Sequence, residues 1–212
     1  MTFHAEVMTD PQRQALSQLA TAEPLQNMYL GGGTAVAVQL GHRTSVDLDW
    51  FTEQPLRDPA ALAGEIAQAA VPFETSSVAR GTLHGLVAGV RISFFETHYP
   101  LLRPVLFWPE FDCRLASAED LGAMKLLAVA QRGARKDFLD VYALGLNAVP
   151  LREMLSLYRQ KYRVDDVSRV LYGLSYFEDA EAEPMPQVLV DLDWNDVKAT
   201  IKQWVKDLAR SR

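Results

Sequence analysis

Alternation of polar and apolar residues predicts a strand over residues 45–51. The alternation puts two acidic and one aromatic side chain on one face and three apolar side chains on the other: Asp47, Asp49 and Phe51 against Val46, Leu48 and Trp50. Before it, residues 27–30 resemble a short buried strand. That strand runs into three glycines, Gly31–Gly33, and a brief apolar helix that stops near Gly41. The predicted order is strand, glycine turn, helix, strand.

A second β-rich region spans residues 73–96. Turn signals at Arg80-Gly81 and Ala88-Gly89 divide it into a meander of three strands, the last over residues 90–96. Two helices are predicted from their starts, because each has an aspartate N-cap before a proline: Asp10 for a helix over 11–21 and Asp58 for one over 59–70.

The character of the chain changes after Cys113. Ser117 and Asp120 have the spacing of a capping box and open a helix through about Arg132. Apolar residues at helical spacing over 151–162 and 197–208 predict two more helices with one core-facing stripe each. We therefore expect an α/β core over residues 1–115 and a helical C-terminal lobe over residues 116–212, packed on that core.

Composition narrows the class of protein. With 212 residues, 49% hydrophobic and 23% charged, the chain can bury a core without disulfides. The only cysteine is expected to be a buried thiol, and the four histidines have no ligand spacing. A net charge of −6 argues against a uniformly basic nucleic-acid-binding face but suits small anions held through metal ions. No membrane span or signal peptide is visible, so we expect a cytoplasmic protein.

The glycine turn has three interpretations. A Walker A loop requires a Gly-Lys-Ser/Thr ending, which this sequence lacks. A Rossmann fingerprint requires a third glycine where Val36 stands. The third interpretation is a nucleotidyltransferase of the polymerase-beta-like class, in which a glycine turn opens a helix and the next strand carries Asp-x-Asp. This is the interpretation that the spacing favours.

Asp47 and Asp49 suit metal binding because alternate residues project from one face of a strand, and carboxylate oxygens are ligands for Mg²⁺. Glycines at 32 and 33 let the backbone approach a triphosphate, whose oxygens the helix N-terminus can bind. The Asp-x-Asp motif alone is weak evidence for a metal site, because Asp191-Leu-Asp193 has the same sequence without a glycine turn before it. We expect Asp191 and Asp193 to be surface or capping residues.

Four segments together resemble the AbiEii/AbiGii-type nucleotidyltransferase toxin family: LGGGTAVAVQLGHRTSVDLDWF (30–51), VRISFF (90–95), LASAEDLGAMKLLAVAQRGARKDFLDVYAL (115–144) and LSYFEDAEAEPMP (174–186). The resemblance implies an α+β, polymerase-beta-like mixed sheet with a helical C-terminal part. It also implies Mg²⁺ (or Mn²⁺), an NTP substrate, and transfer of NMP to a hydroxyl acceptor, in some relatives the 3′ end of tRNA. A cognate antitoxin and a role in a toxin-antitoxin or phage-defence system follow from the same resemblance.

The resemblance also assigns site residues. Asp47 and Asp49 match the metal-binding pair, and Lys125 and Asp140 match the family's later lysine and aspartate. The lysine would be a point charge for the triphosphate, and Asp140 either a base toward the acceptor or the residue that orients the lysine. The full set expected to bind the nucleotide is Gly32, Gly33, Thr34, Arg43, Ser45, Arg132, Lys136 and Asp137.

Three groups of residues also have a simpler structural interpretation. Asp137 and Asp140 could pair with Arg135 or Lys136 on a solvated helix. The acidic residues Glu178, Asp179, Glu181 and Glu183 are most simply a solvated helix end. The aromatic residues occur at core spacings and predict no stacking surface.

The sequence departs from polymerase-beta-like enzymes at the third carboxylate. The strand over 90–96 has Ser93 at its centre and Glu96 only at its end. A protein that keeps the fold but only binds a nucleotide or a partner is therefore the alternative function.

Overall fold

A mixed sheet of seven strands forms one half of the molecule. The computed structural model describes residues 2–210. The strand order is β3-β4-β5-β2-β1-β7-β6, with β2 parallel to β5 and β1 parallel to β7, and the other neighbours antiparallel. The strands are β1 Tyr29–Leu30, β2 Asp47–Thr52, β3 Glu74–Ala79, β4 Thr82–Val87, β5 Val90–Glu96, β6 Leu106–Trp108 and β7 Cys113–Leu115. The predicted meander over 73–96 is confirmed.

The central strand β2 has one buried and one half-buried face, as its alternation predicts. Leu48 and Trp50 are buried in the core, whereas Asp47, Asp49 and Phe51 remain accessible. Two helices pack on the sheet: α1 (Asp10–Ala20) against β2 and β5, and α3 (Pro59–Gln68) against β3 and β4. The face with the two aspartates is thereby left free for a site.

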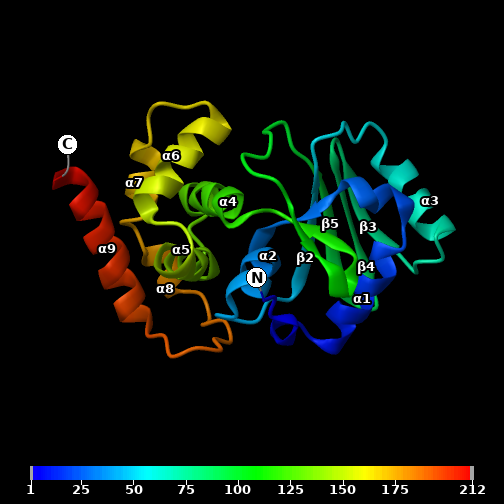
Figure 1. The fold of residues 1–212 in the computed structure, drawn as a ribbon, viewed down its shortest axis with the longest axis horizontal. Helices are drawn as coiled ribbons and strands as arrows, with labels where there is room; N and C mark the ends of the chain where they lie inside the picture. Colours follow the sequence, from blue (N-terminus) through cyan, green and yellow to red (C-terminus); the bar gives the residue numbers. More distant parts are fainter. Residues whose placement is uncertain (1, 211–212) are drawn as a thin grey trace.

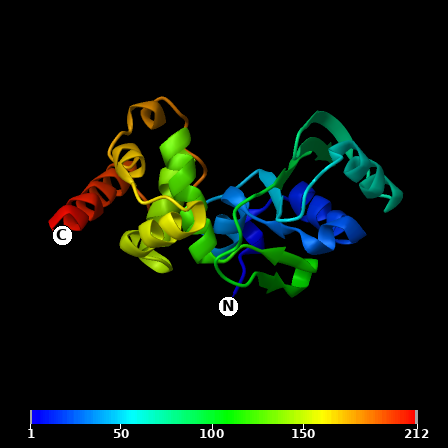
Figure 2. The ribbon, with the colours of Figure 1, turned by 90° about the horizontal axis from the view of Figure 1, so that it is seen from above.

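Helices form the other half, on the opposite side of the molecule from β3 and β4 (Figures 1 and 2). They are α4 Ala118–Gln131, α5 Arg135–Asn147, α6 Leu151–Tyr162, α7 Ser168–Gly173, α8 Glu178–Glu181 and α9 Trp194–Arg210. Helix α4 packs against α5, α6 and α7, and α9 packs against α5 through its buried Val197 and Ile201. Within residues 2–210, none of the helices has both the length and the apolar character needed to cross a membrane.

Helix α2 (Gly32–Leu40) joins the two halves. It packs against β2 on one side and against α4 and α5 on the other, and one hydrophobic core runs through both halves. An isolated bridge between Arg43 and Val188 adds a second connection. The strands end at Leu115 and α4 begins at Ala118, so the change from strands to helices lies between these residues. The division into two domains stays a prediction.

Three local predictions need correction. The N-cap of α1 is Thr9 and not Asp10, because Thr9 and Gln12 exchange the two hydrogen bonds of a capping box. The predicted strand over 27–30 is reduced to Tyr29–Leu30, since a short 3₁₀ helix over Glu23–Asn27 precedes it. Ser117 caps α4, but the Asp120 carboxylate turns to other partners instead of completing a box.

The close packing of α9 on α5 can be tested at Gly145. A Cβ there would lie 2.4 Å from the Trp204 ring, so Gly145→Ala should displace the indole and destabilise the fold by about 1–3 kcal/mol. Gly64→Ala, in α3 with no atom within 4 Å, is the matched control and should stabilise by about 0.5–1 kcal/mol. Denaturant unfolding measures both, and a gain at both positions would contradict the packing.

Candidate functional site

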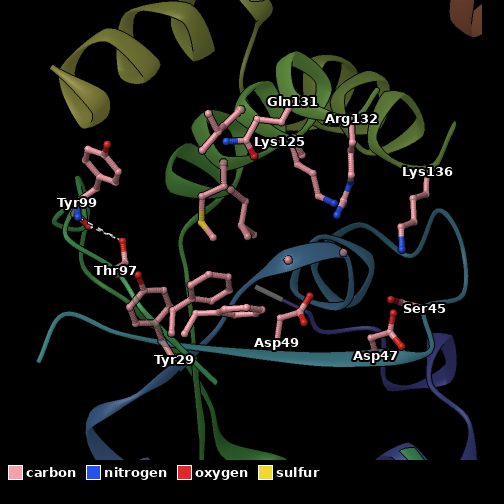
Figure 3. A pocket seen from close by; sticks show the side chains of 18 of the residues that line it. Tyr29, Ser45, Asp47, Asp49, Thr97, Tyr99, Lys125, Gln131, Arg132 and Lys136 are labelled. Carbon is pink, nitrogen blue, oxygen red and sulfur yellow. Dashed lines mark hydrogen bonds between the residues drawn. The ribbon is translucent and has the colours of Figure 1, made fainter. Parts of the chain in front are cut away.

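A cavity of about 730 Å³ lies between the accessible face of β2 and helix α4. The start of α2, the loop before β2, the end of β5 and the cavity-facing side of α4 form its walls. Figure 3 shows its two ends: aspartates face lysine and arginine side chains at one, and tyrosines gather at the other. The site is therefore built by both halves of the molecule.

Three consecutive glycines lie at the base of the site, and Gly32 and Gly33 line the cavity. Gly32 has a φ of +62°, a backbone conformation that side chains disfavour. A Cβ would lie 2.6 Å from the Phe51 ring at Gly31, 2.5 Å from Asp49 Oδ2 at Gly32, and 2.6 Å from Arg43 Nη2 at Gly33. Each glycine thus makes room for a different part of the site, and the first turn of α2 comes close to the carboxylates.

Asp47 and Asp49 lie next to this turn, on the same face of β2 (Figure 3). Burial, with the neighbouring charge of Asp47, raises the pKa of Asp49, and the charges of Lys125 and Lys136 oppose the shift only in part. Asp47 Oδ1 accepts a 2.7 Å hydrogen bond from Arg91 Nε, and the Arg91 side chain is 70% exposed. The two carboxylates therefore repel each other where a cation would be favourable.

The donor set fits Mg²⁺ only together with a substrate. Among residues 2–210 no cluster of three acidic, histidine or cysteine side chains could hold a metal ion. Mg²⁺ is, however, commonly bound by one or two carboxylates plus the phosphates of a substrate, and keeps several waters. Asp47 and Asp49 meet that requirement.

Ser93 is the residue of β5 that lies beside Asp49 of β2. The parallel register pairs Asp49 with Ser93, and Ser93 Oγ shares a 3.0 Å hydrogen bond with His84 Nδ1 on β4. Glu96 pairs with Thr52 at the end of the strand, and its Oε2 accepts the Leu56 N–H at 2.9 Å. The predicted departure at the third carboxylate is present in the structure.

Cationic side chains descend into the cavity from α4 and α5 (Figure 3). Lys125 Nζ lies 3.1 Å from Asp137 Oδ1 and 2.6 Å from Asp140 Oδ2. Arg132 donates to both oxygens of Asp137, from Nε at 2.7 Å and from Nη2 at 2.9 Å. Lys125 and Arg132 are seven residues apart, so both reach the Asp137 carboxylate. Lys136 adds a third positive charge at this end of the cavity.

Asp140 is the centre of a buried charge cluster. Arg43 donates to it from Nε (2.7 Å) and Nη2 (2.8 Å), and His42 Nε2 lies 2.8 Å away. Burial opposes ionisation of Asp140, but the charges of Arg43 and Lys125 and the bonds from His42 outweigh it and hold its pKa well below the usual value. Burial likewise opposes ionisation of Asp137, yet Lys125 and Arg132 lower its pKa.

The predicted site residues fall into two groups. Those that line the cavity are Gly32, Gly33, Arg43, Ser45, Asp47, Asp49, Lys125, Arg132 and Lys136. Three others lie beneath its wall and support it: Thr34, Asp137 and Asp140. Thr34 Oγ1 donates to the Asp47 carbonyl and shares a 2.7 Å hydrogen bond with Ser45 Oγ, so it fixes the loop before β2. Because Asp140 is fully buried, its geometry favours orienting Lys125 over acting as a base.

The alternative prediction, that Asp137 and Asp140 pair with Arg135 or Lys136 on a solvated helix, is wrong. Asp137 and Asp140 are both fully buried, and Arg135 instead donates to the Ala180 and Glu181 carbonyls. The other cautious predictions are confirmed: Cys113 is buried, and Asp193 caps α9 by accepting from the Asn195 N–H at 2.7 Å. The acidic cluster at α8 is exposed, although Glu181 binds Lys198.

The aromatic end of the cavity was missed from the sequence. Tyr29, Phe51, Phe95, Tyr99 and Tyr162 all line it, contrary to the prediction of no stacking surface. The alternation did place Phe51 on the face of Asp47 and Asp49, and this was the available signal.

The buried cluster predicts a large loss of stability for Asp140→Asn. The neutral amide would leave Arg43 without a compensating charge and Lys125 with Asp137 alone, which costs about 3–5 kcal/mol. Because the folded-state pKa is lowered, the contribution of Asp140 is present above the unfolded-state pKa and is lost only as pH falls through the folded-state pKa. Urea unfolding at pH 7, with exposed Asp179→Asn as control, measures the loss; equal midpoints for the two variants would contradict the cluster's role.

Asp49→Asn should have the opposite effect on stability. The folded-state pKa of Asp49 is raised, so its ionised form destabilises the fold above that pKa, and removing the charge should increase Tm at pH 7. Each kcal/mol gained corresponds to about 2–4 °C in a chain of this size. Thermal unfolding without metal or nucleotide measures the change. The gain should shrink as pH falls through the raised pKa, and a Tm decrease at pH 7 would oppose the assignment.

Comparison with known proteins connects this geometry to a family. The family model described as nucleotidyl transferase AbiEii toxin, type IV toxin-antitoxin system, matches residues 14–209. An uncharacterised protein of Aquifex aeolicus (strain VF5) is 36% identical over 202 residues, which cover 92% of this chain and 95% of the relative.

Two solved structures share the fold. JHP933 from Helicobacter pylori has a TM-score of 0.55 and 16% identity, with 96% of each chain covered. MenT4, a nucleotidyltransferase toxin from Mycobacterium tuberculosis, has a TM-score of 0.61 and 14% identity, covering 92% of this chain and 82% of that one. The predicted α+β nucleotidyltransferase fold is confirmed. With a match that spans residues 14–209, the chain belongs to the AbiEii nucleotidyltransferase toxin family.

Proposed function

We propose that this protein is a Mg²⁺-dependent nucleotidyltransferase that moves NMP from an NTP to a hydroxyl acceptor. One observation carries the proposal: a glycine turn and two strand carboxylates line one cavity with the cations Lys125, Arg132 and Lys136. Phosphoryl transfer needs positioning and charge neutralisation more than covalent chemistry from the protein, and these groups supply both.

The triphosphate is proposed to bind at the charged end. Amide groups at the start of α2 and the Ser45 hydroxyl are placed to donate to phosphate oxygens, and Lys125, Arg132 and Lys136 supply the balancing positive charge. Lys125 and Arg132 are held by Asp137, so less conformational entropy is lost when a nucleotide binds.

The transfer step joins the acceptor hydroxyl oxygen to the α-phosphorus and breaks the bond between that phosphorus and the bridging oxygen of the β-phosphate, releasing pyrophosphate. Asp47 and Asp49 are the residues that would hold Mg²⁺. Bound there, the ion would supply positive charge to neutralise the phosphate oxygens. Gly32 keeps the backbone close to Asp49, so that the phosphates and the carboxylates meet at one point.

The biological role that we propose follows from family membership. The acceptor would be an RNA, such as the 3′ end of tRNA, and the activity that of a toxin restrained by a cognate antitoxin in a toxin-antitoxin or phage-defence system. We further propose that it acts in the cytoplasm, where NTPs and tRNA are present.

A second candidate function rests on Ser93. The register of β2 and β5 pairs a hydroxyl, not a carboxylate, with Asp49. A protein that binds Mg²⁺-NTP or a partner without turnover would have the same cavity, and only an activity measurement separates the two functions.

The proposed site predicts stabilisation by Mg²⁺-NTP. Ligand at about 100 times its Kd stabilises by about 2.7 kcal/mol, or roughly 5–11 °C for a chain of this size. We expect this shift with at least one of the four NTPs, only with Mg²⁺, and not in Asp47→Asn. Asp191→Asn, an exposed aspartate in the look-alike Asp-Leu-Asp motif, is the control and should behave as wild type.

Transfer of labelled NMP from the stabilising NTP to total tRNA then distinguishes enzyme from binding module. Incorporation that depends on Asp47 supports the enzyme. A thermal shift without incorporation favours a module that binds a nucleotide. No shift with any NTP would refute the enzyme and favour a module that binds a partner.

A further inference from the structure

The aromatic end of the cavity has no role in the transfer described above. Tyr29 and Phe51 lie with ring centroids 5.9 Å apart in a stacked arrangement, and Phe51 and Phe95 lie 5.3 Å apart. All three rings line the cavity, and two of them are only half buried. We refer to Tyr29, Phe51 and Phe95 as the aromatic floor; Tyr29 is labelled in Figure 3.

The aromatic floor begins directly beside the phosphate turn. A Cβ on Gly31 would lie 2.6 Å from the Phe51 ring and 3.2 Å from Met124 Cε, whereas one on Gly32 would lie 2.5 Å from Asp49 Oδ2. Adjacent residues of one turn therefore contact the aromatic floor and the carboxylate. In a nucleotide only the ribose separates the base from the α-phosphate, which matches this closeness.

A strap, residues 97–105 between β5 and β6, walls this end. Tyr99 on the strap meets Tyr162 of α6 edge to face, with centroids 4.8 Å apart. Thr97 and Tyr99 face the cavity in Figure 3 and hydrogen-bond to each other. The strap thus connects the sheet to the helical half above the aromatic floor.

A buried ion pair holds the strap in place. The Asp120 carboxylate accepts the Leu102 and Arg103 N–H groups, each at 3.0 Å. Lys161 Nζ donates to Asp120 at 2.7 Å and to the Pro100 carbonyl at 2.9 Å. Both charged side chains are buried, and the transfer mechanism does not use them. Their bonds to three strap residues give them a positioning role instead.

We infer that the aromatic floor binds the nucleobase of the NTP by stacking, and that Asp120 and Lys161 are positioning residues that keep the strap closed over it. The inference rests on the proposed function, because the phosphates must occupy the charged end for the base to reach the floor. Aromatic faces stack on every base, so the floor supplies affinity for nucleosides over inorganic phosphates.

Two ligands separate the inference from the proposed function. Mg²⁺-tripolyphosphate contains the phosphates without a base, and Mg²⁺-NTP contains both. Titration calorimetry should show that wild type binds the best NTP more tightly than tripolyphosphate. Phe95→Leu keeps an apolar side chain but removes the aromatic face, and should weaken NTP binding roughly 5- to 150-fold while leaving tripolyphosphate binding unchanged.

The matched control is Phe107→Leu, the same change at a 55% exposed ring outside this cavity, which should bind both ligands as wild type. Asp120→Asn tests the positioning role and should weaken the NTP selectively, as Phe95→Leu does; thermal unfolding verifies that each variant is folded. A merely structural role would weaken both ligands equally.

The outcomes are distinguishable. NTP binding that is unchanged in Phe95→Leu, or no tighter than tripolyphosphate binding in wild type, overturns the inference and leaves the proposed function intact. Equal weakening of both ligands by Phe95→Leu also overturns it. Failure of wild type to bind either ligand would overturn the inference and the proposed function together.

Discussion

The charge cluster around Asp140 is the interaction on which the site depends. Two carboxylates of α5 hold Arg43 from the loop before β2 and Lys125 and Arg132 from α4. Removing such charges from water is costly unless every partner is present, so the cluster favours one relative placement of sheet and helices. The cavity is the space that this placement leaves between the sheet and the helices. Lys125 and Arg132 line it, and the buried aspartates neutralise their positive charge only in part.

The same placement makes the two ends of the cavity chemically different. Toward α5, one wall carries two carboxylates and the opposite wall carries lysine and arginine side chains. This distribution of charge favours an anion that binds together with a divalent cation. Toward the strap the walls are rings, which favours a flat apolar surface. The row Asp49, Ser93 and His84 across three strands adds a neutral hydroxyl where a further carboxylate would increase repulsion. A cation at this site therefore depends more on phosphate oxygens than on the protein.

Local patterns were sufficient for the elements that carry the chemistry. Alternation over 45–51 predicted which face of β2 holds Asp47 and Asp49, and the glycines predicted the turn before α2. The failures concern partners that are distant in sequence. Asp140 could be matched to the family, but its bonds to Arg43 span 97 positions, and no local pattern indicates that both are buried. The aromatic floor was missed for the same reason, since Tyr29 and Phe95 meet only through the sheet.

The long separation between partners has a consequence for synthesis of the chain. Arg43 binds Asp140 and the strap binds Lys161, and both partners follow the last strand in the sequence. A nascent chain that contains every strand of the sheet therefore still lacks part of the cavity walls. Contacts this distant in sequence carry a large loop-closure cost and slow folding. The pairing of the Thr44 N–H with the Gln187 carbonyl postpones completion further. The contacts that complete the cavity walls therefore require synthesis of the chain as far as Gln187.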